Sequence, residues 1–74
     1  MKFYIFKSGA NHGLRAFSDD PGGQKLPGQF RPWHAIGVVP PEVAPPYNFK
    51  RDAIENAIAS AGYQLWRLKS DKKN

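Results

Sequence analysis

The stretch from Asn48 to Lys69, NFKRDAIENAIASAGYQLWRLK, decides the fold, because it predicts one amphipathic helix followed at once by a strand. Asn48 has the side chain to cap the helix, and Gly62 can end it in the left-handed conformation, where a Cβ would clash. Residues 63–68 carry the aromatic and leucine side chains of a strand. The apolar residues between the two ends recur at helical spacing and form one narrow stripe. That stripe consists of Ala53, Ile54, Ala57, Ile58 and Ala61.

Three further strands are predicted upstream of this helix. They are Lys2–Lys7, Leu14–Ser18 and His34–Val39. In the first of them, Phe3 and Ile5 point to one face and Tyr4 and Phe6 to the other, so both faces need cover. The sequence therefore predicts an α+β fold: a small, mostly antiparallel sheet of three to four strands with one helix on a face, in the order β-β-β-α-β. We expect the last strand beside the first, because these two are the most apolar.

Two connections separate these elements. Residues 19–32, DDPGGQKLPGQFRP, contain three glycines together with the apolar residues Leu26 and Phe30. These apolar anchors predict a loop that packs over part of the sheet. Two proline pairs, at 40–41 and 45–46, predict a rigid extended connector before the helix. We assign residues 1–69 to a single α+β domain and residues 70–74 to a basic C-terminal tail.

The length and composition limit the classes of protein to consider. A chain of 74 residues allows one thin core, which buries only about 60% of the unfolded surface. With no cysteine, disulfides and thiolate zinc sites are excluded. Domains of this size often depend on a partner or on self-association for stability. A homodimer is therefore one of the arrangements to test.

The start of the chain and the character of the helix bear on location. MKFYIFKSGA has only four apolar residues in a row, whereas a membrane span needs about 20 and a signal peptide needs a longer apolar region. The helix carries Asp52 and Glu55 opposite a thin stripe, unlike a cationic interfacial helix. We therefore expect a cytoplasmic protein with no membrane partner.

The charge balance favours an acidic partner. Eleven Lys and Arg against six Asp and Glu give a net charge of +5, although Lys69, Lys72 and Lys73 place part of this excess near the C-terminus. Nucleic acid and acidic protein surfaces attract such a chain. Lys50 and Arg51 fall in the predicted first helical turn, where the positive end of the helix dipole favours anions. We consider them candidates for anion binding.

Catalytic and metal-binding patterns are not evident. His12 and His34 lack the HExxH spacing of a zinc site, and no serine lies in a GxSxG elbow. The run Gly22-Gly23-Gln24-Lys25 lacks the GxxxxGK[ST] spacing of a phosphate loop. We predict that the protein is not an enzyme and has no catalytic residue, cofactor or metal. A site built on His12 and His34 across a dimer is a third, less favoured hypothesis.

Ten of the 74 residues are aromatic, more than one narrow helical stripe can cover. Either residues 19–32 cover the second face of the sheet, or that face meets a partner. Aromatic side chains with arginines among them are typical of protein hot spots and of base-stacking surfaces. In a second register, Trp66 lies under the helix and Leu65 faces the other way. The candidate partner-binding residues are Tyr4, Phe6, Arg15, Phe17, Trp66 and Arg67.

Together these observations predict a small basic binding protein that docks on a larger protein or nucleoprotein complex. A phage-type inhibitor of a bacterial defence complex, such as an anti-CRISPR protein, fits the size and the lack of catalytic groups. The alternative is direct nucleic-acid binding through a basic, aromatic sheet face. Neither apolar strand contains the aromatic consensus of RNA-recognition sheets, and one helix cannot form a helix-turn-helix pair.

Overall fold

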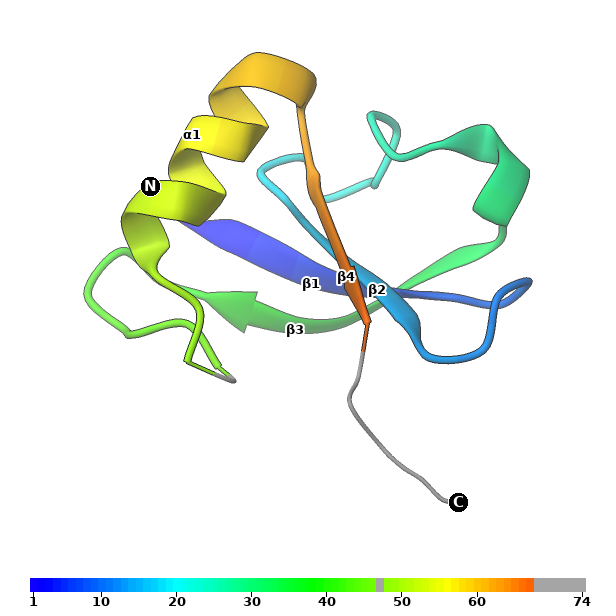
Figure 1. Cartoon of the computed structure of the whole chain (residues 1–74), viewed down its shortest axis with the longest axis horizontal. Coiled ribbons are helices and arrows are strands. Elements are labelled where there is room, and N and C mark those ends of the chain that lie inside the picture. Colours follow the sequence, from blue (N-terminus) through cyan, green and yellow to red (C-terminus); the bar gives the residue numbers. More distant parts are fainter. Residues whose placement is uncertain (47, 68–74) are drawn as a thin grey trace.

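The computed structural model of the chain describes residues 1–46 and 48–67, and these form a small α+β fold (Figure 1). The elements are β1 (Phe3–Ser8), β2 (Leu14–Ser18), the short 3-10 helix η1 (Gly28–Phe30), β3 (Trp33–Val39), α1 (Arg51–Ala61) and β4 (Gln64–Arg67). The predicted order β-β-β-α-β is confirmed. No helix in the described ranges has the length and apolar character needed to cross a membrane. Lys69 and the predicted tail at 70–74 lie outside the described residues.

The four strands form one antiparallel sheet in the order β3-β1-β2-β4. The expectation that the last strand lies beside the first is wrong, because β4 pairs with β2. β1 already has a neighbour on each side, its hairpin partner β2 and the returning strand β3. The last strand can therefore only extend the sheet at an edge, and it does so at the free side of β2.

The helix begins later than its sequence pattern predicts. Its N-cap is Lys50, without a side-chain capping bond, so the prediction that Asn48 caps the helix is wrong. Asn48 instead adopts a φ of 65°, in the left-handed region that asparagine tolerates better than most residues. The chain turns here so that the ring of Phe49 packs against Phe17 and Trp66, with centroid distances of 5.3 and 5.2 Å. Side-chain packing therefore decides where the helix starts.

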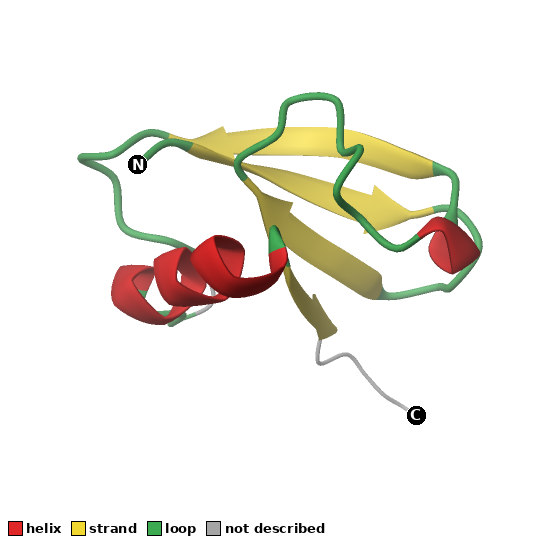
Figure 2. Cartoon of the chain, turned by 90° about the horizontal axis from the view of Figure 1, so that it is seen from above, coloured by secondary structure: helices red, strands yellow, loops and turns green. Residues whose placement is uncertain are grey.

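The C-terminal end of the helix follows the sequence prediction. Gly62 has a φ of 92°, and its N–H donates to the Ile58 carbonyl at 2.8 Å. The helix covers one face of the sheet (Figure 2) and buries Ile54 and Ile58 there. Ala53 and Ala61 stay exposed, so the buried stripe is narrower than predicted. The rest of this helix-side core consists of Phe3, Phe17, Val39 and Trp66.

The segment 19–32 covers the opposite face of the sheet (Figure 2). Leu26 is buried there against Phe6 and Ala16. Two hydrogen bonds hold the segment in place: the indole Nε1 of Trp33 donates to the Pro27 carbonyl at 2.9 Å, and the Ser8 hydroxyl donates to the Phe30 carbonyl at 2.7 Å. The prediction that this connection packs over the sheet is confirmed.

Candidate anion-binding site

A cavity of about 600 Å³ lies where β1 ends and β2 begins. We call this end of the sheet the basic end. The opposite end, where β1 begins and β2 ends, carries both acidic and basic side chains, and we call it the mixed end. The walls of the cavity come from the turn at residues 9–13 and from the strand residues beside it. No carboxylate is among its lining residues in the described chain. Its ionisable lining residues are Lys7, His12, Arg15, His34 and Arg67.

The register of the sheet brings three of these side chains into one row. Lys7 lies opposite Arg15 on β2 and opposite His34 on β3. Directly opposed residues of antiparallel strands share a face, here the face that α1 covers nearer the mixed end. Like charges in opposed positions destabilise a sheet. The Lys7–Arg15 pair therefore weakens the isolated fold, and a bound anion would remove that repulsion.

Arg15 carries the clearest sign of an unmet interaction. Its Nε is buried and has no hydrogen-bond partner among the described residues. Leaving a buried donor unsatisfied costs about 1–3 kcal/mol, and more when the group is charged. An anion in the cavity would relieve this cost, because a guanidinium matches the geometry of phosphate and carboxylate oxygens.

The turn that frames the cavity is held rigidly. The hydroxyl of Ser8 accepts from the backbone N–H groups of Ala10 and Asn11 at 3.1 and 2.9 Å. The Gly9 N–H donates to the Pro32 carbonyl at 2.7 Å. Arg67 donates from Nη1 to the Asn11 Oδ1 at 3.0 Å, which ties β4 to the turn. The basic side chains are thus anchored on a preorganised frame.

Charge divides sharply between the two ends of the sheet. The basic end carries Lys7, Arg15, Arg31 and Arg67. All acidic residues of the described chain lie toward the mixed end: Asp19, Asp20, Glu42, Asp52 and Glu55. Cations accompany them there: Lys2, Lys25, Lys50 and Arg51. Every ion pair between described residues belongs to the mixed end. Within residues 1–46 and 48–67, the basic end is therefore a patch without acidic side chains, on a chain of net charge +5.

The single aromatic patch predicted from the sequence does not form. Phe17 and Trp66 lie in the helix-side core, with 0% and 7% exposure. Tyr4 and Phe6 lie on the other face, where Phe6 is 2% exposed. The prediction of one shared face is wrong, because the register pairs Phe6 with Ala16 and leaves Phe17 on the helix side. The alternative in which Trp66 lies under the helix is the one observed, and Leu65 packs on the opposite face.

Among the predicted binding residues, Arg15 and Arg67 both line the cavity. Sequence reasoning missed Lys7 as their neighbour. A signal was present, because a hairpin centred on Asn11 places Lys7 opposite Arg15. His34 could not be placed in the same way, since its position depends on the pairing of β3 with β1.

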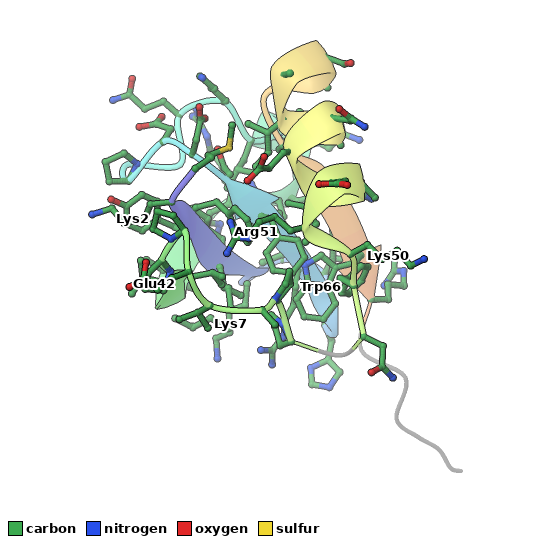
Figure 3. The ribbon with its side chains drawn as sticks, turned by 90° about the vertical axis from the view of Figure 1, so that its left-hand side faces the viewer. Lys2, Lys7, Glu42, Lys50, Arg51 and Trp66 are labelled. Carbon is green, nitrogen blue, oxygen red and sulfur yellow. The ribbon has the colours of Figure 1, made fainter. Side chains whose placement is uncertain are left out.

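Arg51 has a role within the fold (Figure 3). Its guanidinium donates to the carbonyls of Met1 and Pro40 at 2.7 and 2.6 Å, to the Val43 carbonyl, and to Glu55 at 3.3 Å. It also lies 4.9 Å from the centroid of the Phe3 ring. This geometry does not support the predicted anion contact at Arg51, because its donors are already engaged. Lys50 is exposed and points away from the sheet, and its role stays a prediction.

No three His, Asp or Glu side chains gather into a metal-binding group within the described ranges. Comparisons with protein-family models, with curated proteins and with solved structures found no match. The candidate site consequently stands on its own geometry.

Proposed function

We propose that this chain is a small non-enzymatic binding protein that docks on a larger nucleoprotein complex and contacts phosphate groups there through its basic end. The observation that supports this most directly is the cross-strand row of Lys7, Arg15 and His34 beside a cavity that no carboxylate of the described residues lines. Evenly mixed charges would favour a merely soluble surface, whereas this segregation favours attraction of a polyanion.

The burial of the aromatic side chains favours a surface that binds phosphate groups over a surface that forms a protein–protein hot spot. Phe17 and Trp66 are core residues, so they are not exposed anchors for a protein partner. The groups that remain at the surface of the basic end are cations, which neutralise phosphates and release condensed counterions. A patch of this size supplies three or four such contacts, and sequence-independent binding of this kind typically has a Kd of about 10⁻⁴–10⁻⁶ M.

Direct binding to free nucleic acid is the second candidate, and the same basic end favours it. The two functions differ in whether naked DNA or RNA is sufficient or a protein component must be present. Inhibition of a bacterial defence complex, in the manner of an anti-CRISPR protein, is one form of the first function. It stays a prediction based on the small size of the chain and on the lack of catalytic groups in its sequence.

Fluorescence anisotropy with labelled single- and double-stranded DNA and RNA tests the phosphate contact. We expect binding whose log K falls with log salt at a slope of about −3, as for three or four neutralised phosphates. Arg15→Gln should weaken binding several-fold and make the slope shallower by about 1. Lys25→Gln removes the same charge at the mixed end and is the matched control, so its affinity should stay near wild type. An equal loss of affinity in both variants would mean that binding depends on net charge alone and not on the basic end.

The same variants separate the two candidate functions. If naked nucleic acid binds weakly but a host complex captured by pull-down binds tightly, docking on a nucleoprotein is favoured. Arg15→Gln should then reduce capture, and nuclease treatment should reduce it as well. Capture that survives both changes would exclude phosphate contact through the basic end.

A further inference from the structure

β3 forms an edge of the sheet and is unusually open for an edge strand (Figure 1). It is seven residues long, WHAIGVV, and pairs only with β1 within the described chain. It contains no Lys, Arg, Asp, Glu or Pro, which are residues by which natural proteins often protect a sheet edge, and its one irregularity is the register shift opposite Ile5 and Phe6. Ile36 and Val38 are 43% and 51% exposed. The strand therefore presents both apolar side chains and backbone groups that can pair with another strand.

The opposite edge of the same sheet differs in each of these respects. β4 is only four residues long, includes Arg67, and packs beside α1. A short, charged and partly covered strand is a poor template for pairing. The availability of β3 is thus a property of one edge rather than of the whole sheet.

We propose that β3 pairs in antiparallel fashion with β3 of a second copy of this chain, joining the two sheets into one continuous sheet. This inference does not depend on the function proposed above. The free ladder on β3 calls for an extended strand, and antiparallel pairing of two identical strands about a two-fold axis is self-complementary. The register shift against β1 makes Ile36 an extra residue in β3, so His34 and Val38 lie on opposite faces of the sheet. β3 contains no Lys, Arg, Asp or Glu, so no register of the pair places like charges of this kind opposite one another.

The charge distribution favours a second copy as the occupant. Antiparallel pairing reverses one sheet relative to the other, so each basic end lies beside the mixed end of the other copy. The mixed end carries every acidic residue of the described chain, and Glu42 follows β3 by only three residues. Glu42 of one copy is thereby brought toward Arg31, just before β3 of the other. The two most basic surfaces point away from each other, which limits repulsion between chains of net charge +5.

Sedimentation velocity of the full chain, from low micromolar to near-millimolar concentration, tests the proposal. We expect a monomer–dimer equilibrium, with Val38→Lys weakening the dimer at least tenfold by placing a solvated cation on the shared edge. Ala59→Lys makes the same charge change on the exposed side of α1, and its dimer should match wild type. Glu42→Gln should weaken the dimer about twofold to fivefold at low salt, through loss of the two symmetry-related exposed charge pairs.

Far-UV circular dichroism first establishes that each variant is folded. A wild-type chain that stays monomeric over the whole concentration range would overturn the proposal. So would a dimer that Val38→Lys and Ala59→Lys weaken equally, since β3 would then not be the interface. Growth into species larger than a dimer would exclude the closed two-fold arrangement.

Discussion

Arg15 and Arg51 lie at opposite ends of one sheet, and their guanidinium groups have very different surroundings. Arg51 donates to three backbone carbonyls and a carboxylate, whereas the Nε of Arg15 is buried without an acceptor among the described residues. The cause lies in the nearby backbone. At the mixed end, irregular chain brings the carbonyls of Pro40 and Val43 within reach of the Arg51 guanidinium, and the Pro40 carbonyl accepts from the Val43 N–H as well. At the basic end, the carbonyls of Asn11 and Pro32 already accept from backbone N–H groups.

This contrast separates a residue that holds the fold from one that is available for binding. The mixed end should therefore respond to substitution through stability, and the basic end through ligand affinity. The following substitutions test that division.

The largest expected effect is at Phe17, in the core at the mixed end. Its ring is fully buried and contacts the rings of Phe3, Phe49 and Trp66. Phe17→Ala should lower the free energy of unfolding by about 3–5 kcal/mol, because a cavity replaces these contacts. Urea denaturation measures this, and a domain of this size should come close to unfolding. A change below about 1 kcal/mol would show that this core is loosely packed.

Arg51→Met should have the next largest effect, a loss of about 2–3 kcal/mol in unfolding free energy. Methionine keeps much of the side-chain length but removes the charged donors from the Met1 and Pro40 carbonyls. The folded variant should keep wild-type affinity for nucleic acid, measured by the same anisotropy titration. Reduced affinity at unchanged stability would instead return Arg51 to the list of anion-binding residues.

The sequence predicted those parts of the fold that depend on local pattern. The strand Leu14–Ser18 and the end of the helix at Gly62 are both predictable, because each depends on only a few neighbouring residues. The strand follows from the alternation of side chains, and the helix end follows from a glycine placed directly after an apolar stripe. The start of the helix is not predictable in this way, because the packing of Phe49 on Phe17 and Trp66 overrides the capping preference of Asn48. Strand order was missed for a similar reason, since it depends on which sides of β1 are already occupied.

The candidate site was only partly predictable. The sequence marks Arg15 and Arg67 by their nearness to aromatic residues, whereas the structure brings both to the cavity because the register places Arg67 opposite Leu14 and Arg15 opposite Trp66, at the same end of the sheet. His34 joins them across a ladder whose register shifts at a bulge between Ile5 and Phe6. Such an irregularity changes which side chains share a face, and no local pattern in the sequence marks it.

Two glycines with left-handed backbone extend the comparison to smaller effects. At the mixed end, a Cβ on Gly62 would lie 3.0 Å from the Lys25 Cδ, whereas around Gly13, in the turn, there is nothing within 4 Å. Both substitutions to alanine incur backbone strain of about 1 kcal/mol. Gly62→Ala should cost a few tenths of a kcal/mol more, because the Lys25 side chain must also move. Thermal melts of the two variants measure the difference, and a larger loss at Gly13 would contradict the open character of the basic end.

The smallest expected change in stability comes from Arg15→Met, the same replacement as at Arg51 but at the other end of the sheet. It removes a cation that opposes Lys7 and a buried Nε that has no acceptor in the described part of the chain, while the methionine side chain keeps most of the apolar contact. The free energy of unfolding should therefore stay within about 0.5 kcal/mol of wild type or rise slightly, because no satisfied hydrogen bond is lost. Affinity for nucleic acid should fall several-fold in the same preparation. A stability loss as large as that of Arg51→Met would mean that Arg15 holds the fold, and the two ends would then no longer differ in kind.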